Sequence, residues 1–254
     1  MNNRLTSVFS TTTSRGDRHE ILQICSSPRS SACRYPVWRA HCGCYRDAKA
    51  ADHQHNHHPA PPTASEDSMV KIMVDDGLGS GVHIGNGNIL TAAHVVADAK
   101  TVKVKTIAGV EADASVLWVN KDYDIALIHT DGQMFGMSAL DCREPLLGEQ
   151  IQAAGNPLGI EFVSSFGRVA GKARQMGAWK TVVITDITTV MGQSGGPVFA
   201  ADGRVIGINV GVSVAPLKNG KGADGEDAYV PSMTGFGFVV PANAVCMLLA
   251  REAV

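Results

Sequence analysis

From residue 69 onward, the sequence predicts an all-β fold. Short apolar runs alternate there with turn signals, and only 2 of the 27 glycines precede residue 69. Glycine supplies the tight turns and bulges that many short strands require. No alternation of strands with amphipathic helices is present in the sequence, which argues against a parallel sheet and favours a sandwich or a barrel.

The individual strands are predicted from period-two patterns and from the turns between them. Residues 101–107 alternate apolar and polar side chains, as a half-buried strand does. Asn86-Gly87 separates two apolar runs and is typical of a two-residue hairpin turn, because both positions tolerate positive φ. Other strands are expected at 115–119, 125–129, 150–154, 181–185, 204–210 and 235–240, with a turn at 218–225 and one helix at 241–252, which Pro241 starts.

Residues 1–68 differ in composition and are expected to form a disordered tail. They are rich in Ser, Thr and Arg and have no sustained apolar period. We therefore place a domain boundary after residue 68, with one folded domain over 69–254. A start of translation at Met69 would leave that domain intact, and the sequence leaves this alternative open.

The bulk properties argue against several classes of partner. The formal net charge is −2, whereas a nucleic-acid partner favours a strongly basic surface. No run of about 18 apolar residues is present, so neither a transmembrane helix nor a membrane partner is expected. The N-terminus lacks the apolar core of a secretory signal peptide. We expect a soluble protein and leave its compartment and its oligomeric state open.

The cysteines do not define a metal site or a disulfide framework. His41, Cys42 and Cys44 lie close together, but no second matching pair follows that would let four ligands converge on a metal. No metal and no other cofactor is expected, and metal binding by this tract is kept as the alternative. Cys142 and Cys246 are expected to be unpaired thiols, because no framework can be deduced from two scattered cysteines.

Three segments carry residues suited to hydrolytic chemistry. Thr-Ala-Ala-His ends at His94, Asp124 precedes Ile-Ala-Leu, and Ser194 lies within Gly-Gln-Ser-Gly-Gly-Pro. A serine hydroxyl needs a base to take its proton as it attacks, and an imidazole suits that role at neutral pH. A buried carboxylate fixes the imidazole tautomer and stabilises the cation that forms. The three residue types together therefore indicate a catalytic triad.

The glycines around the serine indicate an oxyanion hole. Negative charge develops on the substrate oxygen during attack, so backbone N–H groups must already point at it. The tight turn that glycine permits would aim the N–H groups of Gly192 and Ser194 into one pocket. A side chain at position 192 would tilt that peptide or block the substrate.

The order of the motifs separates two hydrolase folds. The segment around Ser194 also satisfies the Gly-x-Ser-x-Gly elbow of α/β-hydrolases, but that fold needs its histidine after the serine. The last histidine of this chain is His129, so the α/β-hydrolase interpretation fails. Asp122 is the rival carboxylate, two residues away, and Asp124 is favoured by its place in the motif. His83 and His129 are expected to be ordinary strand residues.

With these motifs in this order, the sequence resembles the trypsin-like serine peptidases, and within them the HtrA/Deg branch. The resemblance implies two perpendicular six-stranded antiparallel β-barrels with a C-terminal helix and the active site in the cleft between the barrels. His94 and Asp124 would come from the first barrel and Ser194 from the second. Besides the three motifs, the likeness includes 79–81, 155–159, 185–186, 203–209 and 235–241, within a span from about Gly79 to Asn243.

The sequence departs from the family pattern at several points. Val95 follows His94, where digestive members have a cysteine that pairs nearby. Gln193 is neutral and stands where those enzymes have the aspartate that binds a newly cut N-terminus, so no such activation step is inferred. The HtrA branch usually carries a C-terminal PDZ domain, and none is expected here because the sequence stops at Val254.

The resemblance also places the primary specificity pocket. It puts Thr188 at the floor of that pocket and Gly237 on its wall. No aspartate occupies the floor, so selection for Lys or Arg is not expected, and small or medium apolar side chains are. The loop over residues 212–234 is long enough to reshape the site.

The expected function is that of a serine endopeptidase, which hydrolyses peptide bonds of polypeptide substrates through an acyl-enzyme intermediate. The alternative from another class is a catalytically inactive binding module that keeps the protease fold. All three triad positions and Gly192 are filled, which favours the enzyme.

Overall fold

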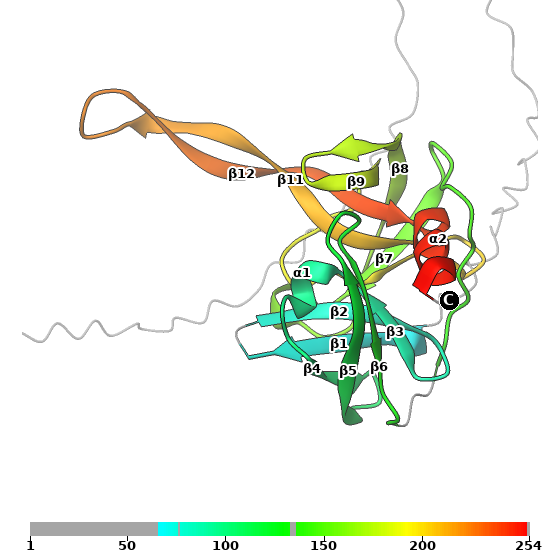
Figure 1. Ribbon diagram of the computed structural model, residues 1–254. Helices are drawn as coiled ribbons and strands as arrows, with labels where there is room; N and C mark the ends of the chain where they lie inside the picture. Colours follow the sequence, from blue (N-terminus) through cyan, green and yellow to red (C-terminus); the bar gives the residue numbers. More distant parts are fainter. Residues whose placement is uncertain (1–65, 76, 133–135, 253–254) are drawn as a thin grey trace, which may run out of the picture. The chain divides into compact units, whose positions relative to one another are not determined.

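The computed structural model describes residues 66–75, 77–132 and 136–252, which form two closed β-barrels and a C-terminal helix (Figure 1). Each barrel has six strands, so the prediction of a double barrel is confirmed. The expectations for residues 1–65, including those for the tail cysteines and histidines, lie outside the described residues.

The first barrel joins its antiparallel strands in the order β1-β2-β3-β6-β5-β4. A 3₁₀ turn, η1 (Glu66–Ser68), leads into it. Its strands are β1 (Met69–Val74), β2 (Gly77–Gly85), β3 (Asn88–Thr91), β4 (Thr101–Thr106), β5 (Glu111–Asn120) and β6 (Ile125–His129), with the helical turn α1 (Ala93–Val96) between β3 and β4.

The second barrel joins its strands in the order β10-β11-β12-β9-β8-β7. Each predicted strand overlaps an observed one, whereas β1, β8 and β10 were not predicted. The strands are β7 (Gln150–Gly155), β8 (Val163–Met176), β9 (Trp179–Thr185), β10 (Pro197–Phe199), β11 (Val205–Lys221) and β12 (Asp227–Pro241), with the turn η2 (Pro157–Gly159) after β7 and the helix α2 (Ala242–Glu252) after β12.

The hairpin between β2 and β3 has the predicted two-residue turn. Asn86 and Gly87 adopt φ values of 53° and 71°, and Gly85 pairs with Asn88 across the turn. A side chain at position 87 would collide with the carbonyl oxygen of Thr130, so glycine is required there for space as well as for conformation.

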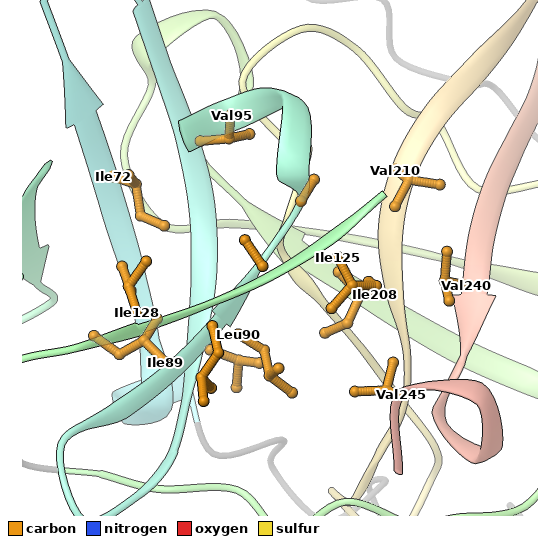
Figure 2. Close-up of a cluster of buried hydrophobic side chains, with 14 of the residues drawn as sticks. Ile72, Ile89, Leu90, Val95, Ile125, Ile128, Ile208, Val210, Val240 and Val245 are labelled. Atoms are coloured by element: carbon orange, nitrogen blue, oxygen red, sulfur yellow. The ribbon is translucent and has the colours of Figure 1, made fainter. Parts of the chain in front are cut away.

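One apolar core fills the first barrel and continues into the contact with the second barrel (Figure 2). Ile125 comes from β6, Ile208 from β11, Val240 from β12 and Val245 from α2, and all four side chains are fully buried. The barrels are therefore held together mainly by the burial of apolar surface, which is favourable and roughly proportional to area. A second cluster fills the second barrel and contains Ile151, Val169, Val183, Ile206 and Val239.

The segment expected to be a loop over 212–234 is instead a two-stranded ribbon, which corrects that expectation. β11 and β12 remain paired as far as Lys221 and Asp227, and Figure 1 shows the ribbon projecting from the second barrel. Lys218 and Lys221 both form ion pairs with Asp227 near its end. The strands were missed because both faces of the ribbon are exposed, so no burial pattern with period two marks them.

Cys142 and Cys246 form a disulfide, so the expectation of two unpaired thiols is wrong. Cys142 lies in the connection between the barrels and Cys246 in α2, with their Cα atoms 5.8 Å apart. The residues are 104 positions apart in sequence, and only the packing of α2 beside that connection brings them together. The neighbouring Arg143 binds Asp141 and Glu149, and its guanidinium holds the pKa of Glu149 below the usual range.

We expect the disulfide to contribute to the stability of the domain. Cys142→Ser should lower the free energy of unfolding by about 2–4 kcal/mol, because the cross-link closes a long loop in the unfolded chain. The midpoint of guanidinium unfolding measures the loss. A reductant should bring the wild type to the midpoint of the variant and leave the variant unchanged, and equal midpoints for the variant and the oxidised wild type would contradict the prediction.

Candidate active site

His94 lies in α1, a single helical turn that follows β3 directly. Val95 and Val96 of the same turn are buried in the core of the first barrel. Their burial fixes the orientation of the turn, and it leaves the imidazole at the surface with 49% of the side chain exposed.

Asp124 immediately precedes β6 and is buried. Its backbone has φ +57°, a left-handed conformation that aspartate adopts more readily than most residues other than glycine. The N–H of Ala93 donates to the Asp124 carbonyl oxygen at 3.1 Å, which joins the residue to α1.

The Asp124 carboxylate binds His94 through both of its oxygens. Oδ1 accepts from the backbone N–H of His94 at 2.9 Å, and Oδ2 lies 2.7 Å from His94 Nδ1. Because a carboxylate only accepts, Nδ1 carries a proton, and in the neutral imidazole Nε2 then has the free lone pair. Asp122 is exposed, so the structure places Asp124 and not Asp122 against the imidazole.

Ser194 lies in a tight turn just before β10. Gly192 and Gly195, on either side of it, have φ values of 94° and 83°. A side chain on Gly195 would collide with Ser80 and Thr91 of the first barrel, so glycine is needed for this approach. The Gly195 N–H donates to the Asn209 carbonyl oxygen at 2.7 Å, which joins the turn to β11.

Gln193 closes the turn with its own side chain. Its Oε1 accepts from the backbone N–H of Val190 at 2.8 Å, and the residue is 3% exposed. This hydrogen bond of the neutral Gln193 amide holds the segment that leads to Ser194.

Ser80 of β2 braces the same turn from the first barrel. Its N–H donates to the Ser194 carbonyl oxygen at 2.8 Å, and its Oγ donates to the Gly192 carbonyl oxygen at 2.7 Å. The backbone N–H and the side-chain Nδ2 of Asn156 both donate to Ser80 Oγ, at 2.9 and 3.0 Å. Ser80, Asn156 and Gly192 are buried, so these hydrogen bonds fix the orientation of the Gly192 carbonyl.

The peptide bonds of the turn leave two N–H groups free. The Met191 carbonyl oxygen accepts from Leu158 at 2.8 Å, and in a trans peptide the N–H of Gly192 points the opposite way. Neither this N–H nor that of Ser194 donates to any acceptor within the described part of the chain. An oxyanion hole requires unpaired donors of this kind beside a nucleophile.

His94, Gly192 and Ser194 line one cavity of about 350 Å³, together with Leu78 and Met191. Within the described ranges, no hydrogen bond joins the side chains of His94 and Ser194. Such catalytic hydrogen bonds are often long in the absence of substrate and tighten when it binds.

Thr188 and Gly237 are the residues that the sequence resemblance places at the specificity pocket. Thr188 is exposed, and its carbonyl oxygen accepts from Ser165 Oγ at 3.2 Å. The next residue, Thr189, is buried, and a Cβ on Gly237 would lie 2.8 Å from its Oγ1. The geometry therefore places Thr189 rather than Thr188 against Gly237.

Three residues with contacts to this site were missed by the sequence analysis. Trp179 donates from Nε1 to Asp124 Oδ2 at 3.1 Å. Ser80 and Asn156 lie in segments 79–81 and 155–159, which carry the family resemblance, so these motifs could have indicated that the two residues lie near the site. Trp179 is one aromatic residue at the start of a strand, and nothing in the sequence distinguishes it from a core residue.

The two other histidines in the described part of the chain, His83 and His129, have structural partners. His83 Nδ1 lies 2.5 Å from the Gly136 carbonyl oxygen, and its Nε2 accepts from the Gly87 N–H. Across residues 66–252 with their gaps, no three His, Cys, Asp or Glu side chains gather in a way that could hold a metal. The helices of this part of the chain are also too short or too polar to span a bilayer.

Comparison with known proteins agrees with this geometry. The family model of the trypsin-like peptidase domain matches residues 79–208. A probable periplasmic serine endoprotease, DegP-like, of Pseudomonas putida is 35% identical over 136 residues, 52% of this chain and 28% of that protein. The chloroplastic protease Do-like 1 of Arabidopsis thaliana is 29% identical over 190 residues, 68% of this chain and 39% of that protein. The chain thus spans well under half the length of these relatives.

Solved structures show the same fold at lower identity. The HtrA-type protease AlgW with a tripeptide has a TM-score of 0.62 at 23% identity, covering 75% of this chain and 62% of that one. The serine endoprotease from Yersinia pestis has a TM-score of 0.58 at 22% identity, covering 74% and 64%. Because the family model covers half of the sequence and the double barrel is complete, the chain belongs to the trypsin-like peptidases, with the HtrA and DegP serine proteases as homologues.

Proposed function

We propose that this chain is a serine endopeptidase that uses His94, Asp124 and Ser194 as a catalytic triad. The observation that carries the proposal is the bond of the Asp124 carboxylate to His94 Nδ1 at 2.7 Å, with His94 and Ser194 on one cavity. The names of the relatives, which include serine endoproteases of the DegP and HtrA type, support the same activity.

The first half of the proposed reaction forms an acyl-enzyme. Ser194 Oγ attacks the scissile carbonyl carbon while His94 Nε2 takes its proton, and Asp124 stabilises the imidazolium that results. The N–H groups of Gly192 and Ser194 receive the negative charge on the substrate oxygen. His94 then gives its proton to the departing amine, and the C–N bond breaks.

The second half hydrolyses the acyl-enzyme. A water molecule takes the place of the amine, and His94 Nε2 removes a proton from it as its oxygen attacks the ester carbon. The same two N–H groups hold the second oxyanion. Its collapse returns the proton to Ser194 Oγ, releases the new carboxyl terminus and restores the free enzyme.

Polypeptides are the proposed substrates. AlgW was solved with a tripeptide, and the cavity beside Ser194 here is lined by apolar side chains such as Leu78, Val95 and Met191. We retain the preference for small or medium apolar residues before the cut bond and keep Thr188 and Gly237 as pocket residues, with Thr189 beside Gly237. The alternative is a binding module without activity.

Replacement of the nucleophile tests the enzyme against the binding module. Ser194→Ala should lower kcat on a peptide library by on the order of a millionfold, because no other group in the turn can form the acyl intermediate. A fluorophosphonate probe should label the wild type and Ser115→Ala, which changes an exposed serine on β5, but not Ser194→Ala. A wild type that neither cleaves peptides nor reacts with the probe would favour the binding module.

Ser80→Ala tests whether Ser80 holds the turn that carries the proposed oxyanion donors, Gly192 and Ser194. The change leaves the Gly192 carbonyl and the Asn156 backbone N–H without their partner, while Asn156 Nδ2 keeps its bond to the Val70 carbonyl oxygen, so we expect the free energy of unfolding to fall by about 1–3 kcal/mol. The loosened turn should also lower kcat by on the order of tenfold, which is less than removal of an oxyanion donor would cost. Denaturant unfolding and steady-state kinetics measure the two effects. Unchanged kcat in a folded variant would contradict the bracing role.

A further inference from the structure

The Asp124 carboxylate accepts a third hydrogen bond, which comes from the other barrel. Trp179 Nε1 donates to Oδ2 at 3.1 Å, and the same oxygen lies 2.7 Å from His94 Nδ1. Asp124 and His94 belong to the first barrel, whereas Trp179 is the first residue of β9 in the second. An N–H group that donates to an ionised acceptor makes a stronger bond than one between neutral groups.

The second barrel fixes the position of the indole. Its ring lies 5.3 Å from that of Phe238 on β12, at an interplanar angle of 52°. On β11, a Cβ at Gly211 would come within 2.9 Å of the indole ring, so only glycine leaves room for the ring in this place. Packing on both sides therefore determines where the N–H points.

The start of β9 makes two further contacts with the segment that holds Asp124. The backbone N–H of Lys180 donates to the Asp122 carbonyl oxygen at 2.8 Å. The Lys180 ammonium lies 5.5 Å from the centre of the Tyr123 ring, within the range of a cation–π interaction. Three consecutive residues, 122–124, are thus held by two consecutive residues of the second barrel.

The geometry points to Trp179 as a positioning residue for the triad, an inference that rests on the proposed function. Its N–H holds Asp124 Oδ2 in the position in which that oxygen meets His94 Nδ1. The indole is packed within the barrel that carries Ser194. The bond between Trp179 and Asp124 therefore also determines the position of the imidazole relative to Ser194. Trp179 acts through Asp124 and takes no part in bond making.

A direct contact with substrate is the rival role for this residue. Trp179 lines a cavity of about 470 Å³ together with His94, Lys121 and Asp124. A substrate residue in that cavity would touch the indole, and loss of the ring would then weaken substrate binding. The experiment must separate positioning from contact.

Trp179→Phe keeps an aromatic ring against Phe238 and removes the donor. We expect kcat on a peptide substrate to fall by roughly tenfold to a hundredfold with KM unchanged, because the lost bond involves a charged group and acts on the chemical step. Trp118→Phe is the matched control, since Trp118 packs half-buried against the same core from β5 and, in the described part of the chain, forms no hydrogen bond with His94, Asp124 or Ser194, so the variant should retain wild-type kinetics. A raised KM with unchanged kcat would assign Trp179 to substrate contact and overturn the proposal.

A small fluorophosphonate reagent gives a second readout, because it reacts with Ser194 without filling the cavity beside Trp179. Its rate of reaction with Trp179→Phe should fall by a factor similar to that for kcat. An undiminished reaction rate would overturn the proposal even if peptide cleavage had slowed.

An isostere separates the N–H from the shape of the ring, and it remains informative if the phenylalanine variant folds poorly. The tryptophan analogue β-(3-benzothienyl)alanine carries sulfur in place of N–H. It can be incorporated at position 179 alone in a background of Trp38→Phe and Trp118→Phe, because the chain has three tryptophans. The analogue should retain the melting temperature and show the same loss of kcat, and full activity would overturn the proposal.

The failure of this inference is distinguishable from the failure of the proposed function. If the wild type neither cleaves peptides nor reacts with the probe, the enzyme assignment itself falls. If the wild type is active and the benzothienyl variant equals its background, only the role of Trp179 is rejected.

Discussion

His94 and Ser194 belong to different barrels, so the position of one barrel relative to the other decides whether the imidazole can serve the serine. A buried apolar contact holds the barrels together, with Ile125 on one side and Ile208 and Val240 on the other. Burial of this kind is strong but non-directional, and it tolerates small shifts between the packed surfaces. General base catalysis tolerates only much smaller shifts, because the proton must pass between atoms at hydrogen-bond distance.

The parts of the site that were predicted from sequence depend on contacts between near neighbours or on fixed motifs. Asn86-Gly87 specifies its turn through the backbone preferences of two residues. His94 and Asp124 lie at the ends of short apolar runs that form β3 and β6, so their position at the edge of a barrel follows from strand length. Ser194 is enclosed by glycines whose positive φ only that residue adopts without strain.

The parts that were missed depend on the way distant segments pack. Cys142 and Cys246 meet only because α2 lies beside the connection between the barrels. Trp179 reaches Asp124 only because β9 begins at the barrel contact. Neither the residue type nor the spacing of Trp179 in the sequence predicts this hydrogen bond. Thr189 lies next to Gly237 because the backbone turns that side chain inward, and the sequence does not indicate this contact.

Hydrogen bonds across the barrel contact supply the direction that apolar packing lacks, and they run both ways. Ser80 of the first barrel binds the carbonyl groups of Gly192 and Ser194 in the second. Trp179 of the second barrel binds the carboxylate of Asp124 in the first. The turn that holds Ser194 and the segment that holds Asp124 are therefore each braced by the barrel to which they do not belong. A relative shift of the barrels would lengthen both sets of hydrogen bonds at once, and polar groups that lose their partners in the protein interior are costly. The relative position of the barrels that the proposed triad needs is thus also the position in which these polar groups are paired.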